Sequence, residues 1–135
     1  MDELLKPALY RAVGTAEVPD RPALLGGACA ACGYVFFPLQ GYGCEKCGGM
    51  ELKPRALSGA GQLLASARVH LHAGKGRVAP FTVGAVRLDD GPIVRTLIIE
   101  EAGPLEVGRR MVTTLESASD AEGAPRLDLR FAPEA

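Results

Sequence analysis

Long hydrophobic runs, an excess of charge and aromatic side chains are scarce or missing in this 135-residue chain. No apolar run approaches the roughly 20 residues that a membrane-spanning helix needs. The formal net charge of −1 gives no broad basic field to attract nucleic acid or an acidic membrane. Aromatic residues make up only 5% of the chain, which leaves few rings for stacking on bases. These features argue against a membrane protein and against a dedicated nucleic-acid-binding protein.

The residue combinations of familiar catalytic sites are also missing. No Ser-His-Asp or Cys-His arrangement is visible, and Gly74-Lys75-Gly76 lacks the glycine spacing and the Ser or Thr of a phosphate-binding loop. The carboxylate pairs Asp89-Asp90 and Glu100-Glu101 are explained by a turn and by a strand end. His70 and His72 share one face of an expected strand, with no neighbouring carboxylate or cysteine to complete a metal site. The sequence therefore predicts that this protein is not an enzyme.

The beginning of the sequence, MDELLKPALYRAVG, has neither the basic region nor the apolar core of a signal peptide. We therefore expect a cytoplasmic protein, whose thiols stay reduced. Apolar residues recur here at helical spacing: Leu4, Leu5, Leu9 and Val13. This spacing predicts a short helix around Asp2–Val13, after which prolines and glycines break the pattern. Residues 1–27 are accordingly expected to form an N-terminal helical extension.

All four cysteines lie in one short stretch, CAACGYVFFPLQGYGCEKCG, as two CxxC pairs that are each followed by glycine. They are Cys29, Cys32, Cys44 and Cys47. Two disulfides would be rare in the cytosol, and a thioredoxin-like site needs one pair that opens a helix. Paired CxxC turns are typical of zinc ribbons, in which four thiolates fill the shell of one Zn²⁺ and leave no position for water or substrate. The spacing predicts a zinc ribbon with a structural zinc over residues 28–55, with rubredoxin-type iron as the alternative.

From residue 56 onward, period-two alternation and β-branched residues predict strands. A long first strand begins near Leu63, and further strands are expected over Phe81–Leu88, Ile93–Ile99, Gly108–Leu115 and Leu127–Phe131. Asp-Asp-Gly between the second and third strands predicts a hairpin turn. Five strands with a long first member favour a small closed barrel over a flat sheet. The expected fold class is therefore mainly β, with a five-stranded OB-fold barrel over residues 56–135.

Four stretches of the chain, in order, resemble one known family: LLGGACAACGYVFFPLQGYGCEKCG, LSGAGQLLASARVH, APFTVGAVRLDDGPIVRTLI and VGRRMVTTLE. From about Leu24 to Phe131 the sequence is similar to the acyl-CoA-associated proteins known as domain of unknown function 35. The resemblance implies an N-terminal helical piece, a rubredoxin-like zinc ribbon and a C-terminal OB fold. It carries the four cysteines over as metal ligands, and it carries over no catalytic residue.

Members of this family resemble small non-catalytic subunits of acyl-CoA enzymes. The resemblance implies an accessory subunit of a hetero-oligomeric acyl-CoA-processing complex, in which this chain helps to form the acyl-CoA site of a thiolase-like partner. Degradation of an aromatic or branched dicarboxylic acyl-CoA is one setting for such a complex. Alternative partners are an enoyl-CoA hydratase of the hot-dog fold and 3-hydroxy-3-methylglutaryl-CoA synthase. The alternative from another class is a single-stranded nucleic-acid binding OB module.

A coenzyme A moiety at a shared interface would require positive charge near its phosphates. The candidates for contacts with these phosphates, or with the partner, are Lys75, Arg77, Arg109 and Arg110. Lys75 and Arg77 also extend a modest basic stripe that includes His70 and His72, for which a solvated strand face is the simpler explanation.

Overall fold

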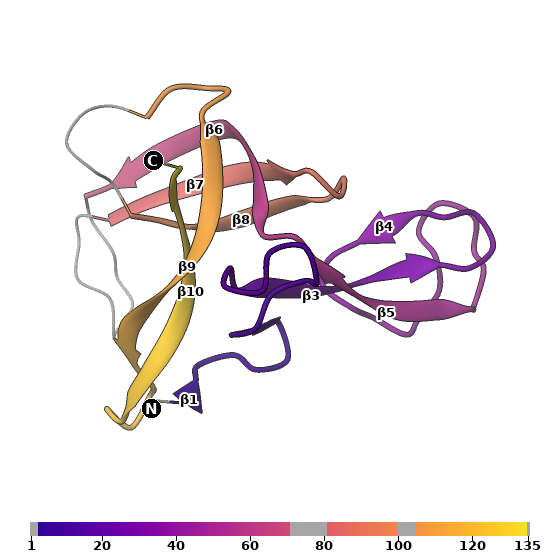
Figure 1. Ribbon diagram of the computed structural model, residues 1–135, viewed down its shortest axis with the longest axis horizontal. Helices are drawn as coiled ribbons and strands as arrows, with labels where there is room; N and C mark the ends of the chain where they lie inside the picture. The colour runs from indigo at the N-terminus through magenta and orange to yellow at the C-terminus, as the bar shows by residue number, and fades with distance from the viewer. Residues whose placement is uncertain (1–2, 71–80, 100–104, 135) are drawn as a thin grey trace.

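The computed structural model describes residues 3–70, 81–99 and 105–134, and these residues form ten strands. Figure 1 shows a barrel from which a narrow ribbon projects to one side. The strands are β1 (Glu3–Leu4), β2 (Tyr10–Arg11), β3 (Ala23–Cys29), β4 (Val35–Phe36), β5 (Leu52–Leu57), β6 (Ala60–Val69), β7 (Phe81–Leu88), β8 (Ile93–Ile98), β9 (Arg110–Ser119) and β10 (Pro125–Pro133). Within these ranges, no helix is long and apolar enough to cross a membrane.

Five of the strands close into a barrel. β7 pairs antiparallel with β6 and β8, and β9 pairs antiparallel with β6 and β10. One parallel bridge, between Phe131 of β10 and Ile98 of β8, completes the ring. The resulting order, β6-β7-β8-β10-β9 and back to β6, makes an OB-like barrel. The predictions of a mainly β protein and of a closed five-stranded barrel are confirmed.

Alternate side chains of the strands fill the barrel, as the period-two pattern predicts. The largest fully buried side chains are Phe131, Leu57, Leu63, Leu88, Met111 and Val86. The register between β6 and β7 shifts between Leu63 and Ala65, which places a bulge where Leu64 interrupts the alternation. Beyond this bulge, the side chains from Ala65 to Arg68 are exposed, so only the first part of β6 contributes to the core.

The prediction of an N-terminal helix over Asp2–Val13 is wrong. In its place, β1 pairs in parallel with β10 and β2 pairs antiparallel with β3, and the described part of the chain contains no helix. Pro7 removes an amide from the interior of the expected helix, and a helix this short has little stability of its own. Pairing with strands that are already ordered therefore outweighs the helical spacing, and the N-terminal extension consists of strands and turns.

The second sheet links the barrel core to the cysteines. β3 is its central strand, and it pairs antiparallel with β2, β4 and β5. At one end of the β3–β5 pair, Leu24 faces Leu57, and both side chains belong to the hydrophobic core. At the other end, Cys29 faces Leu52. The same two strands therefore anchor in the core and carry the metal-binding end of the ribbon outward (Figure 1).

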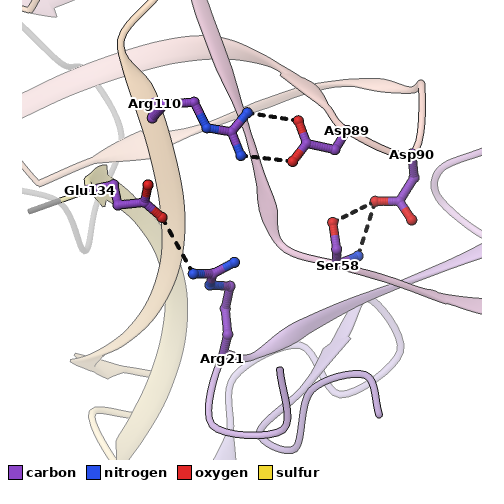
Figure 2. A network of polar contacts seen from close by, with 6 residues as sticks. All are labelled: Arg21, Ser58, Asp89, Asp90, Arg110 and Glu134. Atoms are coloured by element: carbon purple, nitrogen blue, oxygen red, sulfur yellow. Dashed lines mark hydrogen bonds and ion pairs between the residues drawn. The ribbon is translucent and has the colours of Figure 1, made fainter. Parts of the chain in front are cut away.

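Polar contacts fix the second sheet against the barrel. Ser58 follows β5, and its amide and hydroxyl both donate to Asp90 Oδ1 in the β7–β8 turn, at 3.1 and 2.7 Å. In the same turn, Asp89 accepts two hydrogen bonds from Arg110 at the start of β9, at 2.8 and 2.7 Å. Figure 2 shows that these neighbouring contacts join three parts of the chain at one place. The Ser58–Asp90 contacts attach the end of the second sheet to the barrel, and the Arg110–Asp89 pair holds that barrel turn against β9.

Candidate metal centre

Two turns of the same shape present the cysteines. In the first, the Gly33 amide donates to the Cys29 carbonyl, and in the second the Gly48 amide donates to the Cys44 carbonyl, both at 2.9 Å. Gly33 and Gly48 have φ angles of 80° and 78°, in the left-handed region that side chains disfavour. The glycine after each CxxC pair is therefore required by the backbone, as the motif predicts.

Backbone hydrogen bonds hold the two turns face to face. The Cys29 amide donates to the Tyr34 carbonyl at 2.9 Å, and the Cys44 amide donates to the Gly49 carbonyl at 2.8 Å. The Ala30 amide reaches the Glu51 carbonyl at 2.9 Å, which ties the first turn to the chain that leaves the second. Each cysteine pair thus sits on a closed loop, and the β3–β5 pair holds the two loops together.

The four sulfurs form a compact cluster. Cys29 Sγ lies 3.6 Å from Cys47 Sγ, and Cys32 Sγ lies 3.6 Å from Cys44 Sγ. All four sulfurs lie within 4.8 Å of one another. In a tetrahedral site with Zn–S bonds of about 2.3 Å, neighbouring sulfurs are about 3.8 Å apart. The donor set and its spacing therefore fit a Zn²⁺ ion, which these four side chains would hold.

Neighbouring groups shift the pKa values of two of the thiols, Cys44 and Cys47, in opposite directions. The amide of Cys47, with a further contribution from the amide of Lys46, lowers the pKa of the Cys44 thiol to about 7. The Gly49 amide lowers the pKa of Cys47, but the thiols of Cys32 and Cys29 outweigh it and raise this pKa to about 12. Crowded thiolates repel one another, so a bound dication is what allows all four to stay deprotonated.

The environment of the cluster suits a structural role. Cys29 and Cys44 are buried, whereas Cys32 and Cys47 lie at the surface. The Lys46 amide points at Cys44 Sγ and the Gly49 amide at Cys47 Sγ, each at 3.4 Å, so that backbone dipoles support the sulfur charge. Four protein sulfurs fill a tetrahedral shell and leave no place for a reacting ligand. Such a site stabilises the ribbon through the metal.

Comparison with protein families agrees with this geometry. Residues 16–52 match the family described as ChsH2, rubredoxin-like zinc ribbon domain. The expected cofactor, a structural Zn²⁺ in a ribbon, is confirmed by this match together with the four clustered cysteines.

The ChsH2-type ribbon and the barrel together also resemble a solved structure. A chain of the structure described as "Ltp2-ChsH2(DUF35) aldolase" superposes with a TM-score of 0.64 at 23% sequence identity. The match covers 82% of this chain and 84% of the other, so the fold is shared over ribbon and barrel alike. The resemblance to the domain of unknown function 35 family is confirmed. Comparison with curated proteins gave no match.

Of the four basic residues proposed for coenzyme A or partner contacts, the structure describes two. Lys75 and Arg77 lie outside the described residues. Arg109 is exposed, and its Nη2 lies 3.5 Å from the Glu134 carbonyl oxygen. The Arg110 guanidinium is engaged by Asp89, which raises the pKa of Arg110 and lowers that of Asp89. Arg109 thus has the freer side chain of the two.

A buried hydrogen bond joins the N-terminal segment to the barrel, and sequence analysis did not predict it. The Tyr10 hydroxyl donates to Asp128 Oδ1 at 2.7 Å and accepts a hydrogen bond from the Lys6 amide at 3.1 Å. Asp128 is 6% exposed and also pairs with Arg130. Desolvation and the hydrogen bond to Asp128 raise the pKa of Tyr10 to about 12. Tyr10 and Asp128 are 118 positions apart, and no local pattern links them.

Proposed function

We propose that this chain is a non-catalytic accessory subunit of a cytoplasmic acyl-CoA enzyme complex. The observation that carries the proposal is the combined architecture, a ChsH2-type ribbon on an OB-like barrel, which matches over 82% of the chain a structure whose description names ChsH2 together with Ltp2. The expected partner is a thiolase-like enzyme, and the expected assembly is a hetero-oligomer. An aromatic or branched dicarboxylic acyl-CoA is the proposed class of substrate for the complex.

The chemistry of the ribbon supports an accessory role. Its four clustered sulfurs are the ligands that we propose for the zinc, and such a shell has no open position. A tetrathiolate zinc provides no activated water and no Lewis-acid site for a thioester carbonyl. Reacting groups for acyl-CoA chemistry would therefore come from the partner.

The end of the ribbon offers a surface for that partner. Tyr42 is 92% exposed and Met50 is 68% exposed. A Cβ built on Gly43 would lie 3.3 Å from Met50 Sδ, so Met50 lies beside the loop that carries Tyr42. Tyr and Met are enriched at protein interfaces relative to other surfaces. These two residues, which we name the ribbon tip, are the proposed centre of contact.

We further propose that basic residues of the barrel contact the phosphates of coenzyme A held at the shared interface. Arg109 and Arg110 are the described members of the proposed set, and Lys75 and Arg77 are the others. Arg109 is the more accessible because Asp89 engages Arg110. Replacing Arg109 with glutamine in the assembled complex should weaken coenzyme A binding severalfold, whereas the exposed Arg87→Gln should not. Equal affinity in the two variants would remove Arg109 from the set.

Co-purification tests the accessory role. The full chain, expressed with a cleavable tag in its native host, should retain a larger acyl-CoA enzyme at fixed stoichiometry, identified by mass spectrometry. Recovery of a thiolase-like enzyme is the expected result. Recovery of a hot-dog hydratase or a hydroxymethylglutaryl-CoA synthase would support the accessory role but identify a different partner. A chain recovered alone as a monomer would contradict the proposal.

A further inference from the structure

The barrel seam between β8 and β10 is open over most of its length. The two strands share one bridge, Phe131 with Ile98, next to a hydrogen bond of 2.8 Å from the Ile99 amide to the Phe131 carbonyl. On its other side, β10 pairs with β9 continuously from Pro125 to Pro133. Away from the single bridge, toward Val94, β8 and β10 therefore lack the pairing that closes the rest of the ring.

A cleft of about 410 Å³ lies along this seam. Its volume falls within the range of roughly 300–1,000 Å³ that is usual for small-molecule sites. Most of its lining is apolar and comes from β8, from β10 and from the N-terminal and ribbon segments that cover them. Representative residues are Leu9, Leu24, Phe37, Val94, Leu97 and Leu129.

The charged residues of the cleft divide into a paired group and a free group. Asp128 accepts a hydrogen bond from Tyr10 and pairs with Arg130, so its charge is compensated. Lys6 and Arg95 also line the cleft, and both are exposed. Neither makes an ion pair with any residue that the structure describes.

Burial separates the apolar and the cationic parts of the cleft. Leu24 and Val94 are buried at 4% exposure each, so they belong to its floor. Lys6 and Arg95 are exposed and belong to its rim. A molecule that fits this arrangement has an apolar body for the floor and a compact negative charge for the rim.

We propose that this cleft binds an anionic amphiphile with an unbranched apolar chain of medium length and a terminal carboxylate. The chain lies on the floor between β8 and β10, and the carboxylate accepts hydrogen bonds from Lys6 and Arg95. This inference goes beyond the accessory role because it concerns a site within this chain and requires no partner. Its failure would leave the partner proposal untouched, and the reverse is also true.

Calorimetric titration of the full zinc-loaded chain with octanoate, nonanoate and decanoate, below their micellar range, tests the proposal. We expect one binding site per chain, with an affinity that rises about fourfold for each added methylene because each methylene leaves water. The double variant Lys6→Gln/Arg95→Gln should bind decanoate about fivefold more weakly, since two exposed charge contacts are lost. Arg87→Gln, an exposed arginine outside the cleft, should bind as the wild-type chain does.

A second variant separates the cleft from general surface adsorption. Leu97→Trp places a larger side chain in the cleft at a half-buried strand position that tolerates aromatic residues, so the fold should be kept and binding lost. Thermal melting checks the fold of each variant. Unchanged decanoate binding by Leu97→Trp, equal binding of decyltrimethylammonium, or no binding of millimolar decanoate would each overturn the proposal. Capture of an extended peptide at the seam without carboxylate binding would overturn it too.

Discussion

Single residues determine the metal site and the anchor of the N-terminal segment in different ways. Gly33 and Gly48 act locally, because each lets its CxxC turn close through a left-handed backbone conformation. Tyr10 acts at long range, because its hydroxyl satisfies a carboxylate on β10 that would otherwise be buried with a single partner. The first kind of residue is visible in a motif, whereas the second requires the fold.

Replacing Cys29 with serine should remove the zinc and unfold the ribbon, because folding of a small metal domain is coupled to metal binding. Metal analysis is expected to give about one zinc per wild-type chain. The variant should retain only a small fraction of this. Lys46→Ala, an exposed change within the second turn, should leave the zinc content unchanged. A Cys29→Ser chain that kept both its zinc and the dispersed NMR signals of the ribbon would contradict the assignment.

Replacing Tyr10 with phenylalanine should lower the free energy of unfolding by about 1–2 kcal/mol at neutral pH, because Asp128 loses a hydrogen bond while staying buried. The pKa of Tyr10 in the fold, about 12, lies above its ordinary value of 10.0, so the fold favours the neutral hydroxyl. This contribution is complete below pH 10 and is lost as the pH rises toward 12. Denaturation from pH 7 to 11.5 should therefore show the gap between wild type and variant closing above pH 10. The control Tyr42→Phe, at an exposed position, should show no gap, and a Tyr10→Phe gap that is constant with pH would contradict the mechanism.

At the scale of elements, the β3–β5 pair and the β7–β8 turn decide how the ribbon sits on the barrel. The pair joins the core at Leu24 and Leu57 to the cysteines, and the turn receives Ser58 immediately after β5. The Asp90 carboxylate accepts hydrogen bonds from both the amide and the hydroxyl of Ser58. These two bonds fix the path of the chain between β5 and the barrel.

Asp90→Ala should therefore destabilise the protein by about 1–2 kcal/mol, since it leaves a half-buried amide and hydroxyl without their acceptor. The midpoint of urea denaturation measures the effect. Asp20→Ala, an exposed carboxylate that makes no hydrogen bond or ion pair with the described residues, should leave the midpoint unchanged. Equal midpoints for the two variants would show that the Ser58–Asp90 contact does not secure the junction.

Local sequence patterns predict those strands and turns whose conformation depends on neighbouring residues in the sequence. Alternation gives the barrel strands, and the CxxCG repeats give the two turns that present the sulfurs. The N-terminal segment is different, because leucine spacing suggests a helix whereas parallel pairing of β1 with β10 makes it a strand. Ring closure through Phe131 and Ile98, the pairing of Arg110 with Asp89 and the open seam all join distant parts of the chain. Such contacts depend on tertiary structure, which local propensity does not specify.

At the scale of the whole molecule, the ribbon and the barrel carry different features. The barrel contains the seam and most of the core, and the ribbon projects from it (Figure 1). The ribbon carries the four cysteines and the exposed ribbon tip, Tyr42 and Met50. Zinc fixes the loops of the ribbon before any partner binds. The ribbon tip can therefore contact a partner at little cost in conformational entropy.

The double variant Tyr42→Ala/Met50→Ala should weaken association with the proposed partner at least tenfold, because a few residues, often aromatic, supply most of the binding energy of an interface. Retention of the partner on the tagged chain, followed by interferometric titration with the purified partner, provides the measurement. Val13→Ala removes a comparably exposed apolar side chain from the N-terminal segment and should bind normally. Loss of binding in Val13→Ala with none in the tip variant would move the interface away from the ribbon.

The proposed non-catalytic role of this chain is tested most directly by acyl-CoA turnover, measured for the zinc-loaded chain alone, for the proposed partner alone once it has been co-purified, and for the reassembled complex. The account predicts no turnover by the chain alone and faster turnover by the complex than by the partner. Thioester turnover at enzymatic rates by the chain alone, abolished when its own side chains are changed, would contradict it.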